Sequence, residues 1–163
     1  MSGISSPQQA YQTELTANDA TAKEELGSLR WEMTTAGLKC YKYVQNKSGG
    51  ALANGDAVVY DTTTAASAYY QVTTTTTADK NCAAGIGIGA ISSDYYGWIQ
   101  VHGYHDAAKI KGDTDATTAG AFIGTSTTAK KLGGASAAVF GGSVAIESVS
   151  TDATGKVFLR GLV

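Results

Sequence analysis

The chain has little of several residue types that mark common protein classes. It contains one proline and two cysteines, and charged residues make up only 16% of its 163 residues. With so few charges, the outward faces of its elements must carry Thr, Ser, Gln and Tyr, or lie against a partner. Twelve basic and fourteen acidic residues give a formal charge of −2, so nucleic acid is not expected as a ligand. No apolar run reaches the length of a membrane span, so no membrane partner is expected either.

The first residues of the chain carry no export signal. Residues 1–9 have neither a basic start nor an apolar stretch. We therefore expect the protein to stay where it is made or to leave by lysis. In the cytosol Cys40 and Cys82 are expected to be reduced thiols, and a disulfide between them is the alternative if their strands adjoin.

Glycine, by contrast, is abundant, with 20 residues, and Thr, Ala and Ser fill much of the remaining sequence. This mixture is typical of short strands joined by glycine turns. Short strands with no convincing helix between them predict an all-β fold, a sandwich or barrel, and not parallel βαβ units. The expected strands are residues 29–33, 39–46, 57–61, 69–73, 83–91, 98–102, 107–111, 121–124, 138–147 and 156–160.

The second half of the chain contains an approximate internal duplication. Residues 90–103 follow the order strand, turn, glycine, strand, glycine, and residues 145–161 repeat that order with a longer turn. A weaker pair, residues 54–65 and 120–129, precedes them. Two copies are too few for a solenoid. We therefore expect one compact β body in which two hairpin units pack as pseudo-equivalent halves.

The N-terminal region differs in composition from this body. Residues 1 to about 28 are polar and poor in large apolar side chains, so they cannot build a core. Thr21 and Glu24 have capping-box spacing and Gly27 resembles a helix stop, so at most a short helix is expected there. We predict a flexible, extended arm over residues 1–28 that becomes ordered on a partner, and an all-β domain over residues 29–163.

The glycine-rich segment Gly85-Ile86-Gly87-Ile88-Gly89 invites comparison with a phosphate-binding loop. It lacks both the Gly-Lys-Ser ending and the helix that such loops require. Alternation instead places the three glycines on one face of a strand, where another backbone or an aromatic ring can approach closely. The segment therefore predicts packing and not phosphate binding.

The candidates for a metal or catalytic site are incomplete. His102, His105 and Asp106 have no third histidine, and on a continuing strand the two histidines point to opposite faces. Asp113 and Asp115 have a calcium-like spacing but lack the glycine and the distal glutamate of that loop. We expect no catalytic residue, no metal, no cofactor and no enzymatic activity.

The aromatic residues favour a binding or structural role. Nine tyrosines and two tryptophans are amphipathic rings of the kind that is enriched in interfaces. Tyr95 and Tyr96 stand out because two tyrosines at a hairpin tip have little core to enter. The candidate partner-binding residues are Tyr11, Leu15, Leu26, Tyr95, Tyr96 and Trp98.

Four segments share a pattern of glycines and alternating apolar positions: residues 52–59, 85–91, 97–103 and 155–161. In this pattern the chain resembles the small capsid-decoration (cement) proteins of tailed bacteriophages, from about residue 38 to residue 163. The resemblance implies a β-barrel or tulip-like body that attaches to the outside of the major capsid protein shell, often as a homotrimer. The expected location is then the outer surface of the virion, and the host cytoplasm during assembly. The resemblance implies no catalytic residues.

Two other functions stay open at this point. A carbohydrate- or cell-surface-binding β module of a phage fibre is the alternative, because exposed Tyr95, Tyr96 and Trp98 could stack on sugars. An aromatic groove with convergent carboxylates would favour that function, and a flat interface patch would favour the cement function. A small hydrolase would need a cleft that collects His102 and His105 with Asp106.

Overall fold

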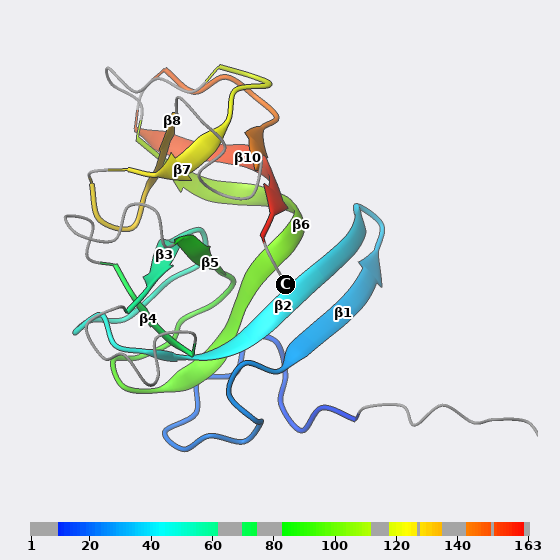
Figure 1. Ribbon diagram of the computed structural model, residues 1–163, viewed down its shortest axis with the longest axis vertical. Helices are drawn as coiled ribbons and strands as arrows, with labels where there is room; N and C mark the ends of the chain where they lie inside the picture. The colour runs from blue at the N-terminus through cyan, green and yellow to red at the C-terminus, as the bar shows by residue number, and fades with distance from the viewer. Residues whose placement is uncertain are drawn as a thin grey trace, which may run out of the picture.

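The structure is a computed structural model that describes residues 10–61, 70–74, 83–111, 118–126, 128–134, 143–150 and 152–161. In these ranges the chain forms β-strands and no helix, and ten strands belong to one hydrogen-bonded sheet (Figure 1). The predicted all-β fold is confirmed. The strands are β1 (Leu29–Thr34), β2 (Gly37–Asn46), β3 (Ala57–Tyr60), β4 (Gln71–Thr73), β5 (Ala83–Gly87), β6 (Tyr96–Ile110), β7 (Ile123–Thr125), β8 (Leu132–Gly134), β9 (Val144–Ala145) and β10 (Ala153–Arg160).

Strand β6 is longer than the sequence predicts. Two expected strands, residues 98–102 and 107–111, are a single strand of 15 residues. Gly103 adopts a φ of +94° within it, so the chain bends there without leaving the sheet. The first half of β6 pairs with β2 and the second half with β10, both antiparallel. The added pairing keeps the polar segment around Asp106 extended.

Five strands pair along a path that returns to its starting strand. The pairings are β2–β4, β4–β3, β3–β5, β5–β6 and β6–β2, of which only β2–β4 is parallel. Every one of these strands contributes apolar side chains to one buried cluster, which we call the ring core. Its members are Cys40, Val44, Leu52, Val58, Val72, Ala84, Ile91, Ile99 and Val101.

A second buried cluster lies between the far half of β6 and strands β7 to β10. Ala57 and Ile86 also join it, so β3 and β5 contribute to both clusters. The glycines of β5 permit this close packing, as predicted. A Cβ on Gly85 would lie 2.6 Å from the Gln100 carbonyl oxygen, and one on Gly87 would lie 2.6 Å from the Ala53 carbonyl oxygen.

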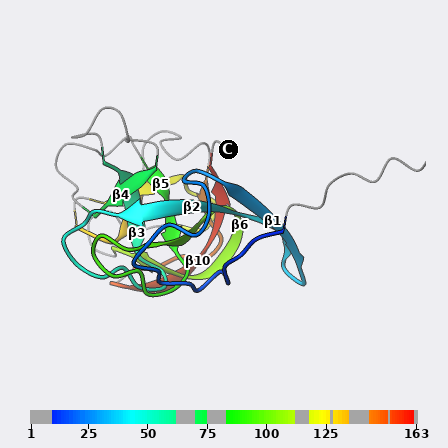
Figure 2. The same cartoon turned by 90° about the horizontal axis from the view of Figure 1, so that it is seen from below.

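Residues 10–28 form no strand, but they lie across the outer face of β2 and β6 (Figure 2). We call this segment the N-terminal strap. Its apolar side chains, Tyr11, Leu15 and Leu26, pack against a buried aromatic cluster of β2 and β6. The members of that cluster are Tyr41, Tyr43 and Trp98.

Polar contacts also hold the strap. The Trp98 indole N–H donates to the Thr13 hydroxyl at 2.9 Å, and Asp19 and Tyr96 exchange backbone hydrogen bonds of 3.1 and 2.9 Å. Glu24 caps no helix; its carboxylate accepts hydrogen bonds from the backbone N–H groups of Gln12 and Thr13. We predicted a flexible arm with nothing to hold it against the body. Residues 10–28 do not fit that prediction, because they pack on β2 and β6. Few apolar residues suffice because each one covers an aromatic ring, and residues 1–9 lie outside the described ranges.

The predicted equivalence of two hairpin units is not confirmed. The second strands of the two copies are neighbours, since β6 and β10 pair antiparallel. Their first strands differ in their partners: Ile91 bridges Leu52, whereas Ala145 pairs directly with Val157. The similar sequences thus occupy different positions in the sheet.

Replacing Thr13 with Ala should lower the free energy of unfolding by about 1–3 kcal/mol, because it leaves the buried Trp98 indole N–H without an acceptor. Urea unfolding followed by far-UV circular dichroism measures the change. Thr13→Ser keeps the hydroxyl and should stay within about 0.5 kcal/mol of the wild type. If both variants are as stable as the wild type, the strap does not stabilise the fold.

Candidate interaction surface

The six residues predicted to bind a partner do not form a common surface. Trp98 is fully buried, so the expectation that its ring is exposed is wrong. Tyr96 stacks on Tyr43 with ring centroids 6.5 Å apart, and Tyr11, Leu15 and Leu26 belong to the strap packing described above. Of the six, Tyr95 is the one with a largely accessible side chain, at 37% exposed. Most of these side chains thus hold the strap to the body.

The histidines of β6 serve packing. The His102 ring lies between the rings of Trp31 and Phe158, with centroid distances of 5.8 and 5.7 Å. His105 is buried, and its Nδ1 accepts a hydrogen bond from the Ala107 backbone N–H at 3.2 Å. Within the described ranges, no group of three or more His, Cys, Asp or Glu side chains is placed to hold a metal ion. Asp113 and Asp115 lie outside those ranges.

Cys40 is a buried, free thiol in the ring core. Burial raises the pKa of this thiol to about 11, so it is protonated at neutral pH and a poor nucleophile. Cys40 is therefore in the expected reduced state, and Cys82 lies outside the described residues.

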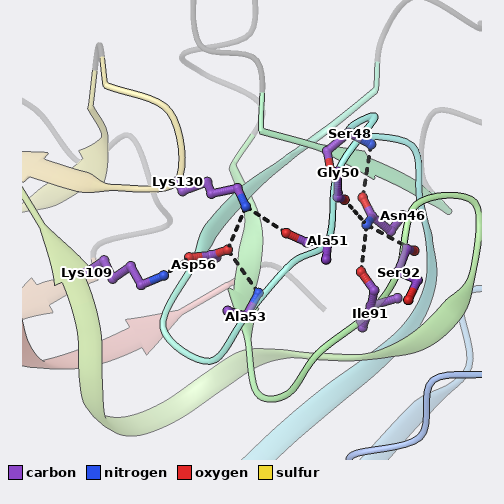
Figure 3. A network of polar contacts seen from close by, with 10 residues as sticks. All are labelled: Asn46, Ser48, Gly50, Ala51, Ala53, Asp56, Ile91, Ser92, Lys109 and Lys130. Carbon is purple, nitrogen blue, oxygen red and sulfur yellow. Dashed lines mark hydrogen bonds and ion pairs between the residues drawn. The ribbon is translucent and has the colours of Figure 1, made fainter.

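The strongest buried charge cluster surrounds Asp56, at the turn that precedes β3 (Figure 3). The Asp56 carboxylate is fully buried and forms ion pairs with Lys109 of β6 and with Lys130, the latter at 3.3 Å. It also accepts a 2.9 Å hydrogen bond from the Ala53 backbone N–H, and Lys130 donates to the Ala51 carbonyl at 2.7 Å. The carboxylate is thus neutralised by two cations. This cluster joins the turn to β6 and to the β7–β8 turn, and we interpret it as structural.

Asn46 organises the neighbouring loops in the same way (Figure 3). Its fully buried side-chain amide donates to the carbonyls of Gly50, Ile91 and Ser92 at 2.7, 2.8 and 3.2 Å. Its side-chain oxygen accepts the Ser48 backbone N–H at 2.9 Å. These hydrogen bonds tie two loops to the end of β2, and the Ile91 carbonyl also accepts the Leu52 backbone N–H. This network is therefore also structural.

On the β1–β2 hairpin the apolar side chains are more exposed to solvent than the charged side chains of β1. Trp31, Met33 and Leu38 are 47%, 78% and 44% exposed. The side chains of Arg30 and Glu32 on the opposite face are only 19% and 31% exposed. An antiparallel hairpin on the surface of an isolated protein normally buries its apolar face and exposes its charged face.

The register places the three exposed side chains together. Met33 lies directly opposite Leu38 and Trp31 opposite Cys40, so all four side chains share one face of the hairpin. We call the exposed part of it, Trp31, Met33 and Leu38, the apolar hairpin face. Because Cys40 belongs to the ring core, this face continues the core stripe of β2 beyond the strands that cover it. Figure 1 shows the hairpin projecting away from β3, β4 and β5.

The strap explains which face of the hairpin is covered. The Arg30 guanidinium donates to the Thr13 carbonyl at 2.9 Å and lies 5.1 Å from the centre of the Tyr11 ring, and it pairs with Glu32 at 2.6 Å. The strap therefore lies on the polar face and leaves the apolar face open. Contiguous exposed apolar side chains of this kind mark interaction sites on soluble proteins.

These three residues are not among those that the sequence predicts to bind a partner. The alternation of Leu29, Trp31 and Met33 is visible in the sequence, but it is also the pattern of an ordinary half-buried strand. The deciding information is which face the strap covers, and that depends on contacts between residues far apart in the sequence. Other exposed apolar side chains lie on different elements: Tyr70, Tyr95, Phe122 and Ile146.

Comparison with known proteins adds no family: no family model matches the chain, and no curated protein is significantly similar to it. Within the described ranges, no helix has the length and apolar character that crossing a membrane would require.

Replacing Asp56 with Asn should lower the free energy of unfolding by about 1–3 kcal/mol, because it leaves two lysines without their buried counter-charge. Chemical denaturation measures the loss. Asp94→Asn is the matched control, since it removes an Asp–Lys pair whose carboxylate side chain is 66% exposed, and it should change stability little. Equal effects of the two substitutions would contradict the assignment of Asp56 as a buried structural charge.

Acid should destabilise the fold through His105. Burial lowers the pKa of His105 below its ordinary value of about 6.5, so below that pH the unfolded chain binds a proton that the folded chain resists. The free energy of unfolding should therefore fall as the pH decreases from about 7 to about 5. Urea midpoints across this range measure the slope. His105→Gln should flatten the slope; a slope unchanged in His105→Gln would refute the assignment.

Proposed function

We propose that the protein is a structural virion protein: a phage capsid decoration (cement) protein that binds the outer surface of the major capsid protein shell and stabilises the head. In this proposal it acts by binding and catalyses no reaction. The observation that carries the proposal is the apolar hairpin face, which is exposed while the polar face behind it is covered. The family resemblance of the glycine and strand pattern is the second support.

The chemistry of this face suits a structural contact. It presents a tryptophan, a methionine and a leucine side chain on a two-stranded surface, and the His102 ring beside Trp31 packs between aromatic rings. Full burial of an exposed Leu or Met side chain is worth about 1.5–3 kcal/mol. Met33, at 78% exposed, gains most of this, and Trp31 and Leu38, at 47% and 44%, gain a part. A repeating shell offers many equivalent sites, so a modest contact per chain gives strong binding when several chains are linked.

The small area of the apolar hairpin face favours an oligomer. A specific interface buries on the order of 800 Å² per partner, which is more than one hairpin face supplies. We therefore propose a homo-oligomer, and a homotrimer is the form that matches the threefold and quasi-threefold positions of an icosahedral shell. The low content of charge predicts binding that is only modestly sensitive to salt.

The carbohydrate-binding alternative has weaker support. Tyr95 is exposed beside Asp94 in the turn before β6, an arrangement in which a ring and a carboxylate could contact a sugar. However, Asp94 is paired with Lys47 at 2.6 Å, and Trp98, the largest candidate stacking ring, is buried. One exposed ring does not make an aromatic groove.

Co-sedimentation with undecorated capsids of its own phage tests the proposed function. The wild-type protein should saturate the shells, and Met33→Asp should weaken binding by about tenfold or more, because it places a charge in an apolar contact. Ile146→Asp is the matched control on another element, 43% exposed in the wild type, and should bind as the wild type does. Failure of the wild-type protein to co-sediment would overturn the proposal, and binding to host polysaccharide instead would favour the alternative.

A further inference from the structure

Strand β1 has a free edge. It pairs with β2 and, within the described residues, with no other strand. Alternation along an antiparallel pair directs the backbone N–H and C=O groups of every second residue toward the partner strand and the others away from it. Tyr43 of β2 donates its N–H to the Ser28 carbonyl, so the even-numbered residues of β1 face β2. The backbone groups of Leu29, Trp31 and Met33 therefore face outward.

Two observations support this direction and define the length of the free edge. The Leu29 carbonyl accepts the Tyr11 hydroxyl at 2.6 Å, which requires that carbonyl to face away from β2. In the described part of the chain, no loop or side chain bonds to the backbone of Trp31 or Met33. The edge is therefore open from Trp31 toward the hairpin turn and is bounded by Tyr11 at Leu29. Open edges of this kind are templates for pairing with another strand.

The side chains on this edge are self-complementary. The order is Leu29, Arg30, Trp31, Glu32, Met33, an apolar and charged pattern that is symmetric about Trp31 except for the opposite sign of its two charges. If a second copy pairs antiparallel with Trp31 at the centre, each Arg30 lies opposite the other copy's Glu32. Each Leu29 then lies opposite a Met33, but the Leu29 carbonyl is already occupied by the Tyr11 hydroxyl, so the backbone hydrogen bonds of the pair are those of the central Trp31 residues. Opposite charges in such cross-strand positions stabilise the pair.

Other symmetric registers are worse. Centring the pair on Glu32 would place the two glutamates directly opposite each other, and centring it on Arg30 would do the same with the two arginines. Like charges directly opposite destabilise a strand pair. Centring on Met33 would leave Arg30 beyond the end of the pairing and place Glu32 opposite Thr34. The charge pattern therefore selects Trp31 as the centre.

We propose that two copies of this chain pair through the free edges of β1, antiparallel and related by a twofold axis at Trp31. The two Trp31 residues exchange their N–H and C=O hydrogen bonds across the axis, and two Arg30–Glu32 ion pairs flank them. The contact is isologous, so each copy contributes the same residues. This inference rests on the edge of β1 and not on the proposed function.

The pairing has a consequence for the apolar hairpin face. Joining two β1 strands makes one four-stranded surface, with Trp31, Met33 and Leu38 of both copies on the same side, because neighbouring residues in a sheet share a face. The apolar area that can contact a further partner is then doubled. The charged side chains of both copies lie on the opposite side, where each strap already covers Arg30.

A pair of charge variants tests this pairing independently of the Arg30–Glu32 contact within one chain. Arg30→Glu makes both positions acidic, and Glu32→Arg makes both positions basic. Each variant alone loses the intrachain pair and faces like charge across the axis, so its self-association should weaken by about tenfold or more. An equimolar mixture should restore wild-type association, because acidic edges then face basic ones. Sedimentation equilibrium gives the masses, and far-UV circular dichroism checks that both variants fold.

A second comparison tests the backbone hydrogen bonds. Trp31→Pro removes an N–H that β2 does not use, and proline is tolerated at such an edge position. Trp31→Ala loses the same side chain but keeps the N–H, so it is the matched control. Self-association should be weaker in Trp31→Pro than in Trp31→Ala.

The expected wild-type species contains an even number of chains: a dimer, or a hexamer in which β1 pairs join two of the proposed homotrimers. A wild-type monomer at high concentration would overturn the edge pairing, and so would a free trimer, in which at least one β1 edge has no partner. Either result leaves capsid co-sedimentation of the wild type free to succeed, so failure of this inference is distinct from failure of the proposed function. If the charge variants associate normally but bind capsids poorly, the edge of β1 contacts the shell, and self-pairing is wrong.

Discussion

The rest of the structure depends on the double pairing of strand β6. Its first half closes the path of strands around the ring core by pairing with β2, and its second half pairs with β10 beside the second core. Gly103, with its positive φ, lies where one pairing gives way to the other. A side chain there would meet the Leu38 carbonyl at 2.4 Å, so glycine is required for both pairings to coexist.

This arrangement determines which apolar surface stays exposed. Because β2 is held on one side by β6, its hairpin with β1 extends past the covered part of the core. The strap then covers the polar face of that hairpin through Arg30 and leaves Trp31, Met33 and Leu38 open. An isolated chain does not gain stability from this distribution, whereas an assembly does, since association removes the apolar side chains from water.

The sequence predicted the fold class and most strands, because strand residues alternate locally and glycines mark their ends. It also predicted the close backbone approach at Gly85 and Gly87, which depends only on the absence of a side chain. It failed for the strap, whose few apolar residues are held by aromatic rings on β2 and β6, far away in the sequence. It did not select the apolar hairpin face either, because the packing that buries Trp98 under the strap and covers the opposite face of the hairpin joins residues far apart in the sequence.

Oxidative footprinting of Met33 tests the central claim most directly, that the apolar hairpin face is the contact surface. Met33 is 78% exposed and is one of two methionines in the chain, so its oxidation can be followed by mass spectrometry of a single peptide. The account predicts rapid oxidation of Met33 in the free protein and strong protection when the protein is bound to capsids. Equal oxidation of Met33 in free and capsid-bound protein would contradict the account.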